Sequence, residues 1–253
     1  MMWGEGCRAV IPMWRGDVWG DGLFKETKRS FGKLGGTMID GERYSPTAED
    51  FSKELESLNS KLSQAIKQHG VDSVAIYLIA FKEVKTIFTQ TQKYSLLSKV
   101  KWYGSDGTAG SKVLTNSNQA ARFAVRTDFT NPIVSEFITD KSEHVKKQVR
   151  EKLKRDPDIY ALVAYDILWV VTKAYLVTGK KTSDALKKAV MQEAKQYTGL
   201  TGWAVLNEAG NRKFGNYDFW SVVEENGTFK WKRTAIYRIS PILPEKVIYV
   251  DKN

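Results

Sequence analysis

The chain has 253 residues, of which 42% are hydrophobic and 27% charged, so it can form a sizeable core and is not disordered throughout. Its single cysteine, Cys7, excludes an internal disulfide and a cysteine-built metal site. The net charge of +10 is unusual, but acids are interleaved with the bases and no nucleic-acid-binding signature is present, which argues for a solvated lysine-rich surface rather than a nucleic-acid interface.

The first half of the chain alternates between apolar runs and amphipathic segments. Apolar runs predict buried strands, and apolar residues spaced three or four apart predict helices. The predicted strands are residues 8–14, 37–40, 73–80 and 100–103, and the predicted helices are residues 23–34, 50–69 and 81–97. This order predicts an α/β fold with a doubly wound, mainly parallel sheet, in which the almost wholly apolar run at 73–80 is a central strand.

The pattern changes after Asn118. We predict a strand at 122–127, a loop from Asn131, and helices at 134–154, 158–178 and 182–196, the second being the most apolar helix of the chain. A strand at 200–206 follows. Residues 217–224 and 229–239 predict a hairpin around Asn226-Gly227, and residues 241–253 form a tail of mixed character.

Three loops follow predicted parallel strands, where α/β sheets bind ligands: residues 15–22, 79–81 and 104–108. They supply carboxylates, an aromatic side chain and helix N-termini. This is the set that a small zwitterion requires, namely a carboxylate for its ammonium, N–H donors for its carboxylate and an apolar wall.

Each of these residues also has a simpler interpretation. Asp17 and Asp21 could cap the following helix, Asp106 could be a turn residue, and Trp19 could be a packing aromatic. Their shared position at strand ends is what favours a ligand role.

Catalytic signatures are absent from the sequence, which contains no GxSxG, HExxH or CxxC motif. His69 follows a helix and His144 lies on a lysine-rich face, so both are interpreted as surface residues. We therefore expect a protein that is not an enzyme, has no cofactor and binds no metal.

Five segments, in order, resemble the type I periplasmic binding proteins. The segments are residues 9–22 (AVIPMWRGDVWGDG), 44–51 (YSPTAEDF), 75–81 (AIYLIAF), 102–109 (WYGSDGTA) and 157–169 (PDIYALVAYDILW). The most similar branch is the substrate-binding proteins of branched-chain amino-acid (Leu/Ile/Val) ABC transporters. The resemblance extends over about residues 7–240.

This resemblance implies two α/β lobes, joined by three hinge strands, that close on an amino acid. Residues 1–118 and 217–240 would form a nearly complete second lobe, residues 119–216 a remnant of a truncated first lobe, and residues 241–253 a C-terminal tail.

For the ligand, the resemblance implies that Asp106 binds the α-ammonium and that Trp19 and Phe81 form the wall. Either Ala80 or Phe81 would occupy one position of this wall, and Asp17 is a further candidate ligand-binding residue.

The chain departs from the family because the first lobe's main strands, and the Ser/Thr groups that hold the ligand carboxylate, have no counterpart in it. The apolar helix at 159–177 would then have no sheet to cover. An exposed apolar face of that size predicts a homo-oligomer or a partner chain. The resemblance adds an ABC permease as a partner.

These observations favour an amino-acid-binding protein related to the receptors of ABC importers. The alternative is a truncated relative that has lost transport and acts as a structural, regulatory or oligomeric interaction protein. A third hypothesis, binding to nucleic acid or anionic surfaces, predicts a steep dependence of affinity on salt. No basic segment followed by an apolar run opens the sequence, which predicts a cytoplasmic protein, whereas the resemblance implies a location outside the membrane.

Overall fold

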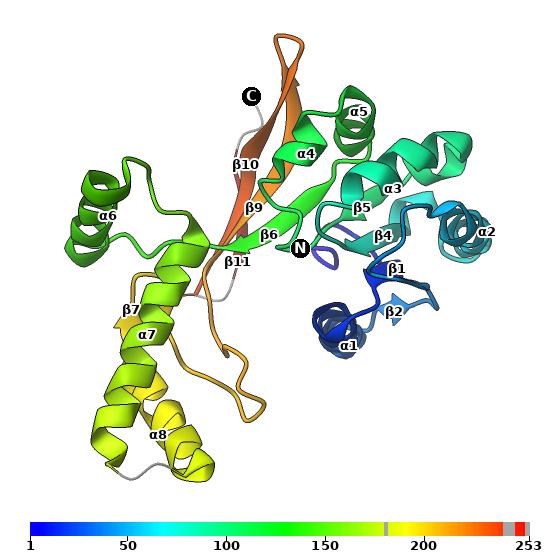
Figure 1. Ribbon diagram of the computed structural model, residues 1–253. Helices are drawn as coiled ribbons and strands as arrows, with labels where there is room; N and C mark the ends of the chain where they lie inside the picture. The colour runs from blue at the N-terminus through cyan, green and yellow to red at the C-terminus, as the bar shows by residue number, and fades with distance from the viewer. Residues whose placement is uncertain (180–181, 240–245, 251–253) are drawn as a thin grey trace. The chain divides into compact units, whose positions relative to one another are not determined.

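The computed structural model describes residues 1–179, 182–239 and 246–250 (Figure 1). Its main sheet has the strand order β11-β10-β9-β6-β5-β4-β1-β2, and β3 also pairs with β1. The pairs that join β1 to β2, β3 and β4, then β4 to β5 and β5 to β6, are all parallel. The α/β class and the mainly parallel sheet are therefore confirmed.

The elements have the following bounds. The main-sheet strands are β1 (Ala9–Arg15), β2 (Thr37–Met38), β3 (Glu42–Tyr44), β4 (Val74–Ile79), β5 (Lys101–Tyr103), β6 (Thr130–Val134), β9 (Tyr217–Glu225), β10 (Thr228–Arg238) and β11 (Lys246–Tyr249), and β7 (Thr198–Gly199) pairs separately with β8 (Gly202–Trp203). The helices are α1 (Val18–Lys33), α2 (Ser52–His69), α3 (Val84–Gln90), α4 (Lys112–Thr115), α5 (Asn118–Arg126), α6 (Asp140–Leu153), α7 (Ile159–Thr178) and α8 (Ser183–Gln196).

Both faces of the central strands are buried. Alternate residues of β1 point to opposite faces: Ile11 packs in a cluster with residues of α2, α3 and α5, and Val10 packs with Phe31 of α1. Every residue of β4 is buried. This explains why residues 73–80 form an almost uninterrupted apolar run.

Polar side chains fix the starts of several helices. Asp17 accepts a hydrogen bond from the backbone N–H of Gly20 at 2.9 Å, so α1 begins at Val18 rather than at the predicted residue 23. Asp158 caps α7 and Thr182 caps α8 in the same way.

The predicted strand at 122–127 is wrong, because these residues lie in or next to α5. The helix buries Ala120, Ala121, Phe123 and Ala124, whose spacing matches a helix face. The strand lies later, at β6, where a loop had been expected, and it pairs with β5 through Tyr103 and Thr130.

Other predicted boundaries also differ. The expected helix at 81–97 contains only α3 followed by 3-10 turns, the helix expected from 134 begins at Asp140, and the expected strand at 200–206 is replaced by the two short strands β7 and β8. The short strand β3 was not predicted.

The predicted hairpin is confirmed as β9 and β10. Asn226 and Gly227 have φ values of 50° and 74°, the left-handed backbone that a tight two-residue turn requires. Of the predicted tail, residues 241–245 and 251–253 lie outside the described residues.

The chain divides into two compact units. Of the described residues, unit 1 comprises 1–133, 219–235 and 249–250, and unit 2 comprises 134–179, 182–218, 236–239 and 246–248. Residues 119–133, which the resemblance assigned to the first lobe, contribute α5 and most of β6 to unit 1. The division falls inside β6, β9, β10 and β11.

Candidate ligand-binding site

The predicted ligand residues follow β1, β4 and β5, which are neighbours in the parallel sheet of unit 1. Because the carboxyl ends of parallel strands lie at one edge, the loops after them meet. The rings of Trp19 and Phe81 stack there, with centroids 4.3 Å apart and planes inclined by 20°. Two residues that are 62 positions apart thus form one aromatic surface.

The turn that carries Asp106 packs against this aromatic surface. A Cβ atom placed on Gly107 would lie 2.6 Å from the carbonyl oxygen of Ala80 and 2.8 Å from the ring of Phe81. Only glycine permits this close approach. The structure therefore brings together Trp19, Ala80, Phe81 and the turn at Asp106.

Ala80 and Phe81 have different environments. Ala80 is completely buried in the core between the sheet and α2, α3 and α5, whereas 39% of the Phe81 surface is exposed. Phe81 is thus the one of the two that presents its side chain at the sheet edge. The guanidinium carbon of Arg15 lies 5.5 Å from the centroid of the Phe81 ring.

Asp106 is partly buried, and this burial raises the pKa of its carboxyl group. Hydrogen bonds from the backbone N–H groups of Asp106 and Gly107 act in the opposite direction and are the smaller effect. The turn is held in place from beneath. The Thr108 hydroxyl donates to Asn131 Oδ1 at 2.5 Å and lies 3.0 Å from the carbonyl oxygen of Ser105. Asp106 therefore sits on a rigid support, where its charge is disfavoured by burial.

Asp17 caps the N-terminus of α1, which is one of the two roles that the sequence allowed for it. Besides capping α1, its carboxylate forms an ion pair with Arg15 Nε at 2.6 Å. The pKa of Asp17 is lowered, chiefly by the hydrogen bond from Gly20. A role for Asp17 in ligand binding stays a prediction.

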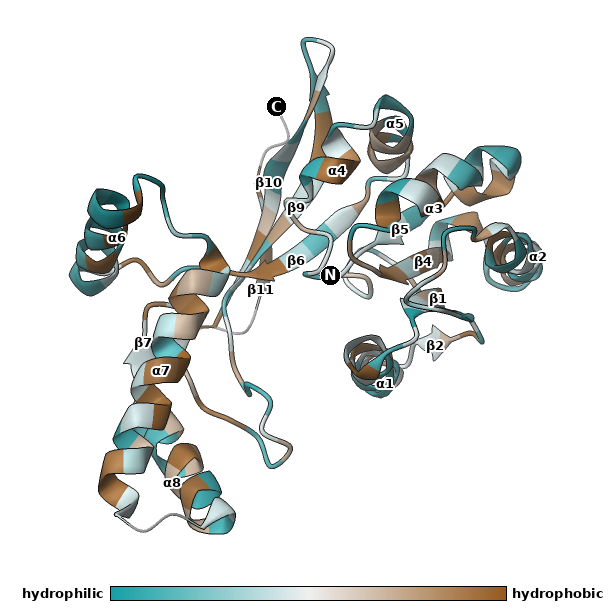
Figure 2. Ribbon diagram, viewed as in Figure 1, coloured by the Kyte–Doolittle hydropathy of each residue, from teal (hydrophilic) through white to brown (hydrophobic). Residues whose placement is uncertain are grey.

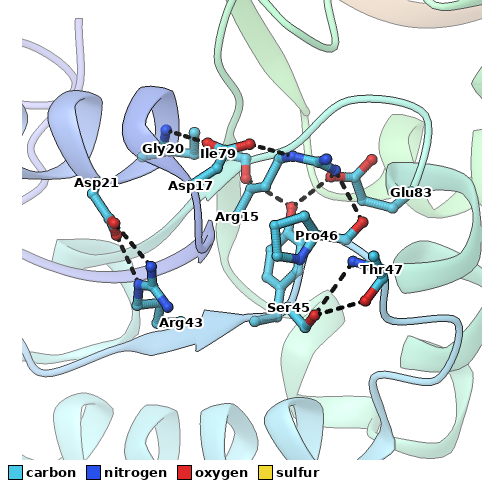
Figure 3. Close-up of polar contacts among 11 residues, drawn as sticks. Arg15, Asp17, Gly20, Asp21, Arg43, Ser45, Pro46, Thr47, Ile79 and Glu83 are labelled. Atoms are coloured by element: carbon cyan, nitrogen blue, oxygen red, sulfur yellow. Dashed lines mark hydrogen bonds and ion pairs between the residues drawn. The ribbon is translucent and has the colours of Figure 1, made fainter.

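A polar network that the sequence did not suggest borders the same edge (Figure 3). Arg15 Nη1 lies 3.0 Å from Glu83 Oε1, and the Tyr44 hydroxyl lies 3.0 Å from the same oxygen and 2.9 Å from the carbonyl oxygen of Ile79. Burial raises the pKa of Tyr44, so it stays a neutral donor. The network joins the ends of β1, β3 and β4.

A second pair lies beside the first turn of α1. Arg43 donates to both oxygens of Asp21, at 2.8 and 2.9 Å, and Trp14 Nε1 donates to Asp21 at 2.9 Å. These bonds lower the pKa of Asp21 to about 2, with Arg43 the largest cause. The carboxylate of Asp21 in α1 is thus bonded to Arg43 of β3 and links the two elements.

The charges at this edge are largely balanced. Arg15 is paired with Asp17 and Glu83, and Arg43 is paired with Asp21. Asp106 differs from Asp17 and Asp21 because burial raises the pKa of its carboxyl group, whereas hydrogen bonds lower the pKa values of the other two. A cation beside Asp106 would favour the charged carboxylate, and the Trp19–Phe81 surface would cover apolar parts of the same molecule.

Comparison with known proteins identifies the family. Residues 5–225 match the family described as the receptor family ligand binding region. The chain belongs to this family. An uncharacterised protein of Methanocaldococcus jannaschii is 30% identical over 244 residues, which are 92% of this chain and 56% of that protein.

Solved structures share the fold. The leucine binding protein LivK of Thermotoga maritima has a TM-score of 0.61 and 16% identity, and the match covers 96% of this chain and 61% of LivK. A periplasmic ligand-binding protein of a branched-chain amino-acid ABC transporter from Burkholderia xenovorans has a TM-score of 0.56 and 16% identity, covering 92% of this chain and 60% of that one.

This member of the receptor family thus has the type I periplasmic-binding-protein fold. It spans little more than half the length of the curated relative and about three-fifths of the two solved ones.

Proposed function

We propose that the chain is an amino-acid-binding protein related to the receptors of ABC importers, and that it binds its ligand without catalysis. The observation that carries this proposal is the stacked pair Trp19–Phe81 beside the partly buried Asp106, at the carboxyl edge of a parallel sheet. The printed names of similar structures, a leucine binding protein and a branched-chain amino-acid receptor, support the ligand class.

Each group has a role that follows from its chemistry. Asp106 accepts hydrogen bonds from the ligand ammonium, whose positive charge offsets the cost of burying the carboxylate. Phe81 and Trp19 form the apolar wall, since a branched aliphatic side chain gains free energy when it leaves water. Arg15 and Glu83 hold the loops after β1 and β4 in register.

In this proposal unit 1 is the second lobe and unit 2 is the remnant of the first. The chain passes between the units within β6, β9, β10 and β11, and the first three of these passages are the candidates for the three hinge strands. The donors for the ligand carboxylate would come from the part of the fold that this chain does not span. By the same likeness the receptor works outside the membrane with an ABC permease, and a homo-oligomer or a partner chain completes the first lobe.

The test is a titration of intrinsic tryptophan fluorescence with the common amino acids. We expect a saturable change with leucine, isoleucine or valine, since Trp19 lies at the site. Trp19→Phe should remove most of the signal, and Trp203→Phe, in unit 2, should not. A flat response from folded protein would refute amino-acid binding and favour the alternative, a structural or regulatory protein.

A further inference from the structure

Strand β6 has polar side chains in the interior of unit 1. It lies between β5 and β9 in the main sheet, and Figure 2 shows it as hydrophilic over its first part and hydrophobic only at its end. Thr130 and Asn131 are nonetheless buried, with 5% and 0% of their surfaces exposed. A buried polar side chain costs free energy unless it is hydrogen-bonded, so the partners of these two residues show what the strand holds together.

The side-chain amide of Asn131 joins the turn that contains Asp106 to strand β9. Its Oδ1 accepts the hydrogen bond from the Thr108 hydroxyl at 2.5 Å. Its Nδ2 donates to two carbonyl oxygens, that of Phe129 at 3.3 Å and that of Trp220 in β9 at 3.5 Å. The contact with Trp220 is at the outer limit of a hydrogen bond, so it is the first of these contacts that a small displacement would break.

The packing around Asn131 holds its amide in this position. A Cβ atom placed on Gly104 would lie 1.8 Å from Asn131 Oδ1, and the N–H of Gly104 donates to the carbonyl oxygen of Thr130 at 2.9 Å. Thr108, on the other side of the amide, is completely buried. Because close-packed interiors transmit displacements, a shift of the turn shifts the amide of Asn131 with it.

Both strands that Asn131 joins pass between the units close to it. The chain leaves unit 1 after residue 133 in β6 and returns to it between residues 218 and 219 in β9. Asn131 lies two residues before the first passage, and Trp220 is the second residue after the other. A continuous series of contacts therefore runs from the Asp106 turn to two of the segments that connect the units.

We propose that Asn131 is a positioning residue that couples the Asp106 turn to these connecting segments, so that a molecule bound at Asp106 stabilises β9 next to its passage between the units. A ligand ammonium at Asp106 restrains the turn and with it the Thr108 hydroxyl. The restrained hydroxyl then holds the Asn131 amide in its contact with Trp220. The effect of a ligand rests on the proposed function, whereas the link from the turn to β9 is present without one. Coupling free energies are reciprocal, so a firmer contact at β9 also favours the ligand.

A neighbouring series of hydroxyl groups supplies a control. It runs across β6, β9 and β10: the Thr130 hydroxyl lies 2.8 Å from that of Ser221, which lies 3.1 Å from that of Thr234. All three side chains are buried. Loss of one of them loosens the same strands but leaves the contacts between Thr108, Asn131 and Trp220 in place.

The first test is hydrogen–deuterium exchange of residues 217–222 in the ligand-free chain, measured by mass spectrometry. Thr108→Val keeps the side-chain volume and removes the hydroxyl that holds Asn131, so this exchange should be about 3- to 10-fold faster. Thr108→Ser keeps the hydroxyl and should restore the slow exchange. The matched control is Thr91→Val, because Thr91 is also buried in unit 1 and donates to the carbonyl oxygen three residues earlier, that of Phe88. It should leave the exchange of residues 217–222 unchanged.

The second test adds leucine at a saturating concentration, with binding measured in parallel by calorimetry. Leucine should slow the exchange of residues 217–222 in the unaltered chain and in Ser221→Ala, and this protection should be lost in Thr108→Val. Unchanged exchange in ligand-free Thr108→Val, or an equal acceleration in Thr91→Val, would overturn the proposal.

The two tests separate the coupling from amino-acid binding. Leucine that binds without slowing the exchange in the unaltered chain would overturn the coupling and leave the proposed function intact. If no amino acid binds and Thr108→Val still accelerates the exchange, the proposed function is refuted and the link between the turn and β9 is supported.

Discussion

Replacing Asp106 by Asn should separate ligand binding from stability. The substitution keeps the shape of the side chain and removes its charge. A hydrogen bond to a charged group contributes about 1.5–3 kcal/mol, so loss of the bond to the ligand ammonium should weaken amino-acid binding by about 10- to 150-fold. Titration calorimetry at neutral pH measures this change directly.

The same variant should not lose stability without ligand. Burial raises the pKa of Asp106 in the folded chain, so its contribution is most favourable below the unfolded pKa and is lost as the pH rises through the folded pKa. At neutral pH the charged carboxylate therefore costs stability, and Asp106→Asn should melt at the same temperature as the unaltered chain or higher. Ligand affinity of the unaltered chain should fall as the pH drops through the raised pKa.

The control is Asp72→Asn, which alters an exposed aspartate of the same unit before β4. It should change neither affinity nor melting temperature. Full affinity in the Asp106 variant, or unfolding of that variant without ligand, would refute the reasoning, because the carboxylate would then be either uninvolved or a structural necessity.

The other predictions concern packing and hydrogen bonds. Phe81→Ala removes the stacking partner of Trp19 and should weaken leucine binding, measured by calorimetry, while unchanged affinity would remove Phe81 from the wall. Asp166→Ala leaves two buried backbone N–H groups without an acceptor and should destabilise unit 2 by about 2–6 kcal/mol in urea unfolding; a loss below about 1 kcal/mol would mean that the loop finds other partners. Gly104→Ala places a Cβ atom 1.8 Å from Asn131 Oδ1 and should lower the melting temperature, and an unchanged value would contradict the tight packing beneath the Asp106 turn.

The sequence predicted the central sheet well because burial on both faces leaves a direct pattern in it. The apolar run at β4 and the Asn226-Gly227 turn of the hairpin are local signals, and both elements formed as expected. Residues 122–127 were wrongly predicted as a strand because the alanines of α5 carry little pattern of their own, and it is their burial against the core that makes them the inner face of the helix.

The candidate site was predicted only in part. The strand-end rule indicated Trp19, Phe81 and Asp106 without showing that the two rings stack. The ion pair between Arg15 and Glu83 joins residues 68 positions apart, and no local pattern links them. Tyr44 was missed because it ends β3, a strand of three residues that is too short to show alternation.

Calorimetric titration of the folded 253-residue chain with leucine tests the central claim most directly. The account predicts saturable, one-to-one binding that is lost in Asp106→Ala. Folded chain that gives no heat with leucine, isoleucine or valine would contradict it.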